Sequence, residues 1–394
     1  MTINNQIFDF RMPGNVKIGA NSFNTIHSDI EQFQPKNILL ISDKGLQEAG
    51  VVEKIVHDLS RHNIPIQTFT DISGEPYFET LNLAIQFIKD NQSDLVIGIG
   101  GGSALDVAKA AACLANKEED NITEILLGHS TPLSKGISCI LLPTTSGTGS
   151  EVTMNAIFGD TSNGVKRGIV SPFYLPDVAI IDPILTLSCP AKVSAASGVD
   201  AFTHAIESYI AKKATPLTKL YAREAMVKFP ANITKAVFNG SDLKAREEMC
   251  WVSFLAGVSL ANAGVGAVHA LAYPLGGKYH VPHGVANALL LPYVFKVIGK
   301  TCMEEMVHIA NYLQLGDYTD NPHEALGKVV EYLFNLLKEL GLPKTLKELN
   351  VNENDLEPMA NEASKVIRLL ENTPYELNKK EIHQIYINSF FGNE

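Results

Sequence analysis

The chain has 394 residues, of which 45% are hydrophobic and 19% are charged, a composition that supplies core material for two domains and excludes a dominant disordered region. Its formal net charge is −11, and it has no block of Lys and Arg that would bind a phosphate backbone, so nucleic acid is excluded as an expected partner. The five cysteines form no C-x-x-C pair, and the N-terminus MTINNQIFDF lacks the pattern of a signal peptide, so we expect a cytoplasmic protein without a disulfide framework.

Residues 1–185 alternate short apolar runs with helical stretches. The runs at 37–42, 94–100, 138–145 and 178–182 are almost continuously apolar, which is typical of strands buried on both faces of a parallel sheet. Strands that alternate with helices predict an α/β domain with a mostly parallel sheet. Ligands of such a domain should bind at the carboxyl ends of the strands.

Residues 186–394 are expected to form a second, all-helical domain. Long amphipathic patterns such as LTKLYAREAMVKF and HEALGKVVEYLFNLLKELG replace the strand-like runs after Pro190. The uncharged stretch 251–277 raises the question of a membrane span, but it contains His269 and Pro274, so we interpret it as a buried helix and expect no membrane partner. No flexible linker separates the two halves, and the cleft between them is the expected active site.

Two polar loops that follow apolar strands predict a nucleotide site. Gly100, Gly101, Gly102 and Ser103 lie between a strand and a helix, where backbone N–H groups and the helix dipole can bind a pyrophosphate. The second loop, PTTSGTGSE at 143–151, concentrates hydroxyl groups and glycines after the next strand. The G-x-G-x-x-G spacing of dinucleotide sites is met only loosely, so a glycine-rich turn without a ligand stays open as the alternative.

Asp43 ends the strand at 37–42 and has two interpretations. A carboxylate at a strand end can accept hydrogen bonds from an adenosine ribose and repel a 2′-phosphate, which favours NAD over NADP. The same side chain can instead cap the helix that begins near Lys44. The local sequence does not decide between the two.

Four side chains form a candidate metal site. Asp200 and His204 are four residues apart on a helical pattern, so they share one face. His269 lies in an apolar stretch where ligation would offset its cost of burial, and His283 follows in a VPHG turn that can fold back toward it. Three imidazoles and one carboxylate suit Fe²⁺, or Zn²⁺ as the alternative, with a further position for a substrate oxygen. Each histidine alone could instead be a hydrogen-bonded core or surface residue.

Taken together, these motifs resemble the iron-containing (group III) alcohol dehydrogenase family. The resemblance spans nearly the whole chain and rests on GGGSALDVAKA, LPTTSGTGSEVT, the stretch from Asp182 through Asp200 to Glu207, and HALAYPLGGKYHVPHG. It implies the dehydroquinate synthase-like architecture, in which a Rossmann-like N-terminal domain binds NAD(P) and a helical C-terminal domain holds one divalent metal. Homo-oligomers, dimers or larger, are usual in the family. The implied metal ligands are Asp200, His204, His269 and His283.

The resemblance also assigns a cofactor site. The pyrophosphate loop of the family falls on residues 100–103, and its segment of nucleotide-contacting hydroxyl groups falls in the loop 143–151. The expected cofactor-binding residues are Asp43, Gly100, Gly101, Gly102, Ser103, Asp106, Thr144, Thr145, Ser146, Thr148 and Lys166.

Two positions depart from the pattern of the family. Many members carry a second histidine four residues after the third metal ligand, thought to assist proton movement, and here that position is Tyr273. A tyrosine has an ordinary pKa of about 10 and is a poorer proton shuttle near neutral pH. His280 lies close in sequence and could replace the missing group, although a solvent-facing histidine is the alternative. Glu75 stands where many relatives place Asn, so we assign no contact of the family there.

The resemblance implies a metal-dependent oxidoreductase that transfers a hydride between NAD(P) and a small primary alcohol or aldehyde. A related lyase or cyclase of the dehydroquinate synthase type is the alternative within enzymes, but such enzymes bind phosphorylated substrates with many basic residues. The apolar stretch ANAGVGAVHALAYPLGG around His269 favours a small and weakly charged substrate. A non-catalytic relative would be expected to have lost a metal ligand or the glycine loop, and all of them are present.

Overall fold

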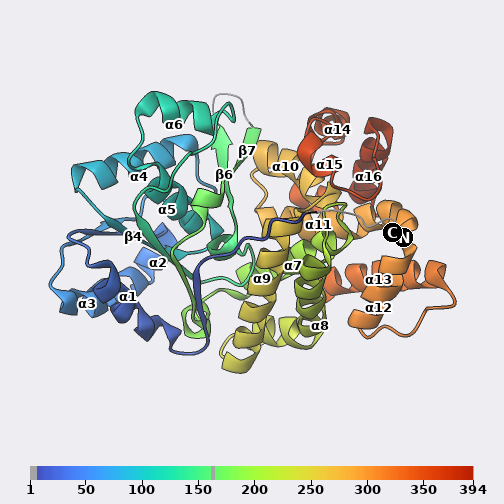
Figure 1. The fold of residues 1–394 in the computed structure, drawn as a ribbon. Coiled ribbons are helices and arrows are strands. Elements are labelled where there is room, and N and C mark those ends of the chain that lie inside the picture. The colour runs from blue at the N-terminus through green and yellow to red at the C-terminus, as the bar shows by residue number, and fades with distance from the viewer. Residues whose placement is uncertain (1–6, 161–164, 394) are drawn as a thin grey trace.

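The structure, a computed structural model, describes residues 7–160 and 165–393 of the chain. Figure 1 shows an α/β half, coloured blue to green, beside a helical half coloured yellow to red. The main sheet has six parallel strands in the order β1-β8-β5-β4-β2-β3. Their bounds are β1 Asn15–Ile18, β2 Ile38–Ile41, β3 Ile66–Phe69, β4 Leu95–Gly100, β5 Ser138–Pro143 and β8 Val178–Ile181.

The four strands predicted from apolar runs are confirmed as β2, β4, β5 and β8. These strands are apolar at successive positions because both faces of the sheet are covered. Ile38 and Leu40 of β2 pack into one apolar cluster, and Leu39 and Ile41 pack into the cluster on the opposite face. The helices of this half are α1 Ile26–Phe33, α2 Lys44–Glu48, α3 Val51–Leu59, α4 Phe78–Asp90, α5 Gly102–Leu114 and α6 Glu119–Leu126.

A hairpin that the sequence did not predict lies between the two halves. Strands β6 (Asn155–Asp160) and β7 (Val165–Val170) form a separate antiparallel sheet. Strand β7 packs against a helix of the second half, α10 (Ala267–Tyr279), while β6 packs against α5. The hairpin therefore forms one wall between the nucleotide loops and the helical half (Figure 1).

The described part of the chain after the short 3-10 helix η5 (Pro183–Thr186) is helical. Helices α7, α8 and α9 pack against one another, and α10 and α11 pack side by side. The predicted helical patterns lie in α8 and α13. The bounds are α7 Ala191–Ile210, α8 Pro216–Phe238, α9 Leu243–Ala263, α10 Ala267–Tyr279, α11 His283–Ile298, α12 Met303–Tyr312, α13 Pro322–Glu339, α14 Leu356–Ala363, α15 Ile367–Leu370 and α16 Lys379–Phe391.

The stretch 251–277 is mostly buried, as expected, but it forms two helices and not one, because the chain breaks there. Helix α9 ends at Ala263, its cap Gly264 takes a φ of +74° that favours glycine, and α10 begins three residues after that cap. No single helix among the described residues has the length and composition to cross a membrane; α9 and α10 meet these criteria only as a pair, bent by 102°. The break gives α10 a new direction and brings His269 beside Asp200, His204 and Glu207 of α7.

Candidate active site

The four predicted metal ligands come together in the structure. Asp200 and His204 lie one turn apart on α7, His269 lies in the first turn of α10, and His283 is the first residue of α11. The ligand atoms that they offer all lie within 4.8 Å of one another. The Oδ1 atom of Asp200 is 3.8 Å from the Nε2 atom of His204 and 3.9 Å from that of His283. One ion with bonds of about 2.0–2.2 Å would need only a small contraction of this set.

The protonation states of these groups suit a divalent cation. Burial lowers the pKa of His283 to about 3 and also lowers the pKa of His204, so both imidazoles are neutral at pH 7. Burial alone would raise the pKa of Asp200, but the three histidines and a hydrogen bond from Asn287 hold it below its ordinary value. Neutral imidazoles and an ionised carboxylate are the forms that bind metal. The donor set of three nitrogens and one oxygen fits Fe²⁺ or Zn²⁺.

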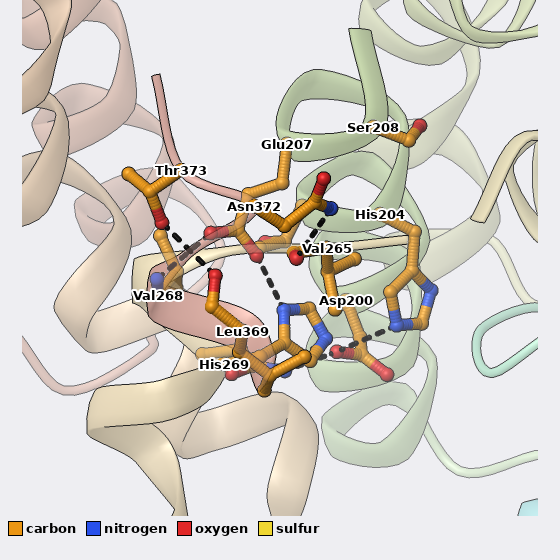
Figure 2. Close-up of polar contacts among 12 residues, drawn as sticks. Asp200, His204, Glu207, Ser208, Val265, Val268, His269, Leu369, Asn372 and Thr373 are labelled. Atoms are coloured by element: carbon orange, nitrogen blue, oxygen red, sulfur yellow. Dashed lines mark hydrogen bonds and ion pairs between the residues drawn. The ribbon is translucent and has the colours of Figure 1, made fainter. Parts of the chain in front are cut away.

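Glu207 orients His269 and was not predicted as a site residue. Its Oε2 atom accepts a hydrogen bond of 2.5 Å from Nδ1 of His269, and its Oε1 atom accepts one of 2.8 Å from the backbone N–H of Val268. Figure 2 shows the carboxylate of Glu207 on one side of the ring and Asp200 on the other. With the proton held on Nδ1, the lone pair of Nε2 faces the cluster, which is the arrangement that a carboxylate imposes on a histidine that binds metal. The spacing could have revealed Glu207, since it lies seven residues after Asp200 on the same helix.

Asn287 is a second residue that the sequence reasoning missed. Its side-chain nitrogen lies 2.7 Å from Oδ1 of Asp200, 3.0 Å from Nε2 of His269 and 3.1 Å from Nε2 of His283. An amide group has two N–H donors, so it cannot satisfy all three of these acceptors at once. The arrangement of surplus acceptors in a buried place is the observation that best fits a bound cation. Asn287 lies one helical turn after His283, a spacing that the sequence already contained.

A cavity of about 380 Å³ joins the histidine cluster to the nucleotide loops. At one end it is lined by His204, His269 and His283. At the other end it is lined by predicted cofactor residues, namely Gly102, Ser103, Asp106, Thr148 and Lys166. The apolar side chains of Leu260 and Val265 form part of the wall between these ends. The structure thus brings the two predicted sites to one cavity.

The glycine loop has the geometry that a phosphate site requires. Strand β4 ends at Gly100, whose φ of +151° is unusual for other residues, and α5 begins at Gly102. A Cβ atom on Gly102 would lie 2.6 Å from Cγ2 of Thr148, so only glycine fits beside that side chain. The backbone N–H of Thr144 donates to the carbonyl of Gly100, which holds the two loops together. Thr145 lies against Gly101, and Ser146 contacts Cys250.

Two predicted cofactor residues already have partners within the protein. Asp43 caps α2 by accepting a hydrogen bond of 3.0 Å from the backbone N–H of Leu46, and its other oxygen faces Gly100. Both interpretations of Asp43 are therefore compatible with its position. The carboxylate of Asp106 accepts hydrogen bonds from the hydroxyl of Ser150 and the backbone N–H of Ile157. A cofactor contact of Asp43 or Asp106 stays a prediction.

The residues that depart from the family pattern also line the cavity. Lys166 forms an ion pair with Glu75, and a Cβ atom on Gly276 would overlap its side chain. Tyr273 is partly buried, and burial raises its pKa further above the ordinary value of 10.0. His280 is exposed, at the C-terminal cap of α10. Both candidate proton shuttles thus lie at the cavity, and Glu75 contacts a predicted cofactor residue.

Comparisons with known proteins agree with this geometry. The family described as iron-containing alcohol dehydrogenase matches residues 13–183, and the C-terminal part of the Fe-containing alcohol dehydrogenase family matches residues 194–390. The chain is 40% identical to long-chain-alcohol dehydrogenase 1 of Geobacillus thermodenitrificans, over 95% of each chain. It is 35% identical to 1,3-propanediol dehydrogenase of Citrobacter freundii, over 98% of this chain and 99% of the relative.

A crystal structure of 1,3-propanediol oxidoreductase superposes with a TM-score of 0.92 at 34% identity, covering 98% of this chain and all of the other. These relatives are dehydrogenases, which supports an oxidoreductase over the lyase or cyclase alternative. The fold, the cavity and the full-length matches lead to one conclusion: the chain belongs to the iron-containing alcohol dehydrogenase family and is an NAD(P)-dependent enzyme of that type.

Proposed function

We propose that Asp200, His204, His269 and His283 bind one divalent metal, Fe²⁺ or alternatively Zn²⁺, at which a small primary alcohol is oxidised or an aldehyde reduced. The convergence of these four side chains on the cavity that also reaches Gly102 carries the proposal. A bound divalent cation acts as a Lewis acid that lowers the pKa of an alcohol and stabilises negative charge on a carbonyl oxygen. A nicotinamide cofactor held by the loops 100–103 and 143–151 would supply the acceptor or donor of the hydride.

The residues of the chain position the reactants and the proton. The backbone N–H groups in the first turn of α5, which begins at Gly102, would bind the pyrophosphate of the cofactor. Leu260 and Val265 exclude water from the apolar side of the cavity. The proton of the alcohol leaves through Tyr273 or His280, which both line the cavity. A cavity of about 380 Å³ must also take the nicotinamide, which favours a small substrate.

NAD is proposed as the cofactor in preference to NADP. Asp43 follows β2, and its free oxygen lies beside the glycine loop at Gly100. A carboxylate at this place accepts hydrogen bonds from a ribose and repels a 2′-phosphate. Turnover with NADH should therefore exceed turnover with NADPH. Conversion of Asp43 to Asn, which keeps a helix cap, should narrow that difference.

The organisation of the molecule beyond the site stays at the level of prediction. We propose residues 1–185 as the NAD(P)-binding domain and residues 186–394 as the metal- and substrate-binding domain, with β8 and α7 on either side of the boundary. A homodimer or larger homo-oligomer and a cytoplasmic location are likewise predictions. Chromatography with light scattering tests the first of these, and cell fractionation tests the second.

The function is tested with protein purified without oxygen and loaded with Fe²⁺ or Zn²⁺. NADH or NADPH consumption is followed with short aldehydes, with 3-hydroxypropanal and with long-chain aldehydes, since two relatives are named for 1,3-propanediol and long-chain alcohols. We expect metal-dependent turnover that His269→Ala abolishes. The matched control is His323→Ala, which removes an exposed histidine of α13. Turnover that survives without metal, or in His269→Ala, would refute the proposal.

A further inference from the structure

Arg368 places a positive charge in the cavity, and no motif in the sequence predicted this residue there. It is the second residue of α15 and is solvent-exposed. Its side chain lines the cavity together with His269 and Tyr273, and its guanidinium and the hydroxyl of Tyr273 both lie beside Gly168. One terminal guanidinium nitrogen lies 3.5 Å from the place that a Cβ atom would take on Gly168 of β7. The guanidinium thus lies between α10 and the hairpin, in the same cavity as the metal ligands.

The segment that carries Arg368 is fixed relative to the metal site. The side-chain amide of Asn372 donates to the carbonyl groups of Ala263 and Val265, at 2.9 and 3.0 Å, where α9 breaks into α10. The hydroxyl of Thr373 donates to the carbonyl of Leu369, and Figure 2 shows both residues beside His269 and Glu207. Asn372 and Thr373 are both buried. The bonds of Asn372 join the turn after α15 to the break before the helix that presents His269, which places the backbone of Arg368 beside the cavity.

The charge of Arg368 lies apart from the carboxylates that the structure describes around the cavity. Lys166, the other cation that lines the cavity, is paired with Glu75. Asp106 lies 3.1 Å from the Nζ atom of Lys109 and accepts from Ser150. Among the residues that the structure describes, no carboxylate lies within ion-pair distance of the guanidinium of Arg368. A cation in a partly enclosed cavity with an adjacent tyrosine hydroxyl is suited to receive an anionic oxygen group.

We propose that Arg368 is a specificity-determining residue, which binds a carboxylate-like group at the end of the substrate remote from the reacting carbon. The inference rests on the proposed function and narrows its substrate class to small aldehydes, or the matching alcohols, with an anionic oxygen group. A guanidinium presents two parallel N–H donors to a carboxylate, and the hydroxyl of Tyr273, which also lies beside Gly168, offers a further polar group. The inference departs from the weakly charged substrate that the apolar stretch around His269 favours, and the experiments below decide between the two.

The test compares two aldehydes of similar shape that differ in charge. 4-Oxobutanoate ends in a carboxylate where 4-methylpentanal ends in an isopropyl group. With metal-loaded protein and NADH, Arg368→Gln should lower kcat/KM for 4-oxobutanoate about tenfold or more, because a charge-assisted hydrogen bond is lost. The value for 4-methylpentanal should change less than about twofold, because no charged contact is lost. Arg368→Lys keeps the charge and should give an intermediate value.

Controls separate this role from others. Arg61→Gln removes an exposed guanidinium of the α/β half that is paired with Asp58, and it should leave the preference between the aldehydes unchanged. An equal fall for both aldehydes in Arg368→Gln, or no fall for either, would overturn the inference. So would a rise in the KM for NADH alone, since Arg368 would then contact the cofactor. A wild-type enzyme that reduces only 4-methylpentanal would also overturn it.

A binding measurement distinguishes failure of this inference from failure of the proposed function. Titration calorimetry of the metal-loaded protein, without cofactor, compares 4-hydroxybutanoate with 4-methylpentan-1-ol. Binding of 4-hydroxybutanoate that weakens about tenfold in Arg368→Gln supports the role of Arg368 even if neither aldehyde is turned over. Equal binding of 4-hydroxybutanoate to wild type and Arg368→Gln overturns it, whatever the activity.

Discussion

Conversion of Glu207 to Gln should weaken metal binding without changing the shape of the site. Glu207 is 2% exposed and accepts two hydrogen bonds, one of 2.5 Å from His269 and one of 2.8 Å from Val268. The amide oxygen of Gln can still accept from Val268, but its NH₂ group then faces the N–H of His269. The imidazole must either lose this partner or move its proton to Nε2, the nitrogen that faces the cluster.

The expected magnitude follows from that change of partner. Loss of an outer partner of a metal-binding histidine costs about 10- to 100-fold in metal affinity, or about 1.4–2.8 kcal/mol. Competition with a chromophoric chelator measures the dissociation constant for Zn²⁺ directly. Glu224→Gln, which alters a carboxylate of α8 that is 45% exposed, is the matched control. An unchanged dissociation constant in Glu207→Gln, with native thermal stability, would show that Glu207 does not orient a metal ligand.

Three further predictions concern the α/β half. Burial raises the pKa of Glu151 from 4.5 to about 7, so the folded state holds a proton that the unfolded state loses, and the free energy of unfolding should fall as pH rises from about 4.5 to about 7. Urea unfolding of Glu151→Gln should show a shallower dependence on pH than that of the wild type. An equal dependence in both proteins would contradict the raised pKa of Glu151. Gly102→Val places side-chain atoms against Thr148 and should raise the KM for NADH about tenfold, with a smaller change in kcat. The control is Gly327→Ala, where the added atom meets open space, and it should leave KM and kcat unchanged. Lys109 is 1% exposed and donates to backbone carbonyls beside a carboxylate. Lys109→Met should therefore lower the free energy of unfolding, measured with urea, by about 3–5 kcal/mol. A decrease below about 1 kcal/mol would refute the structural role of Lys109.

Features that depend on neighbours in the sequence could be predicted. The buried strands appear as apolar runs because both faces of the sheet are covered, and β4 is buried at every position. Asp200 and His204 could be paired because helical spacing places them on one face of α7. The glycine loop could be located because a strand, a turn and a helix follow one another there.

Features that depend on distant contacts could not be predicted. The break between α9 and α10 is stabilised by Asn372, which lies more than a hundred residues further along the chain. The β6–β7 hairpin gains its place from packing against α5 and α10, which no local pattern contains. Arg368 reaches the cavity only because the segment after α14 folds back onto α10. Glu207 and Asn287 are intermediate cases. Their helical spacing from Asp200 and His283 is visible in the sequence, but the side chains that they contact are not.

X-ray absorption spectroscopy of the Zn²⁺-loaded protein tests the metal site most directly. We expect one ion per chain, bound by three imidazole nitrogens and a carboxylate oxygen at about 2.0–2.2 Å. The spectrum of His283→Ala should then show one imidazole fewer. A sulfur ligand at about 2.3 Å, or fewer than three imidazoles in the wild-type protein, would contradict the assignment of Asp200, His204, His269 and His283 as the metal ligands.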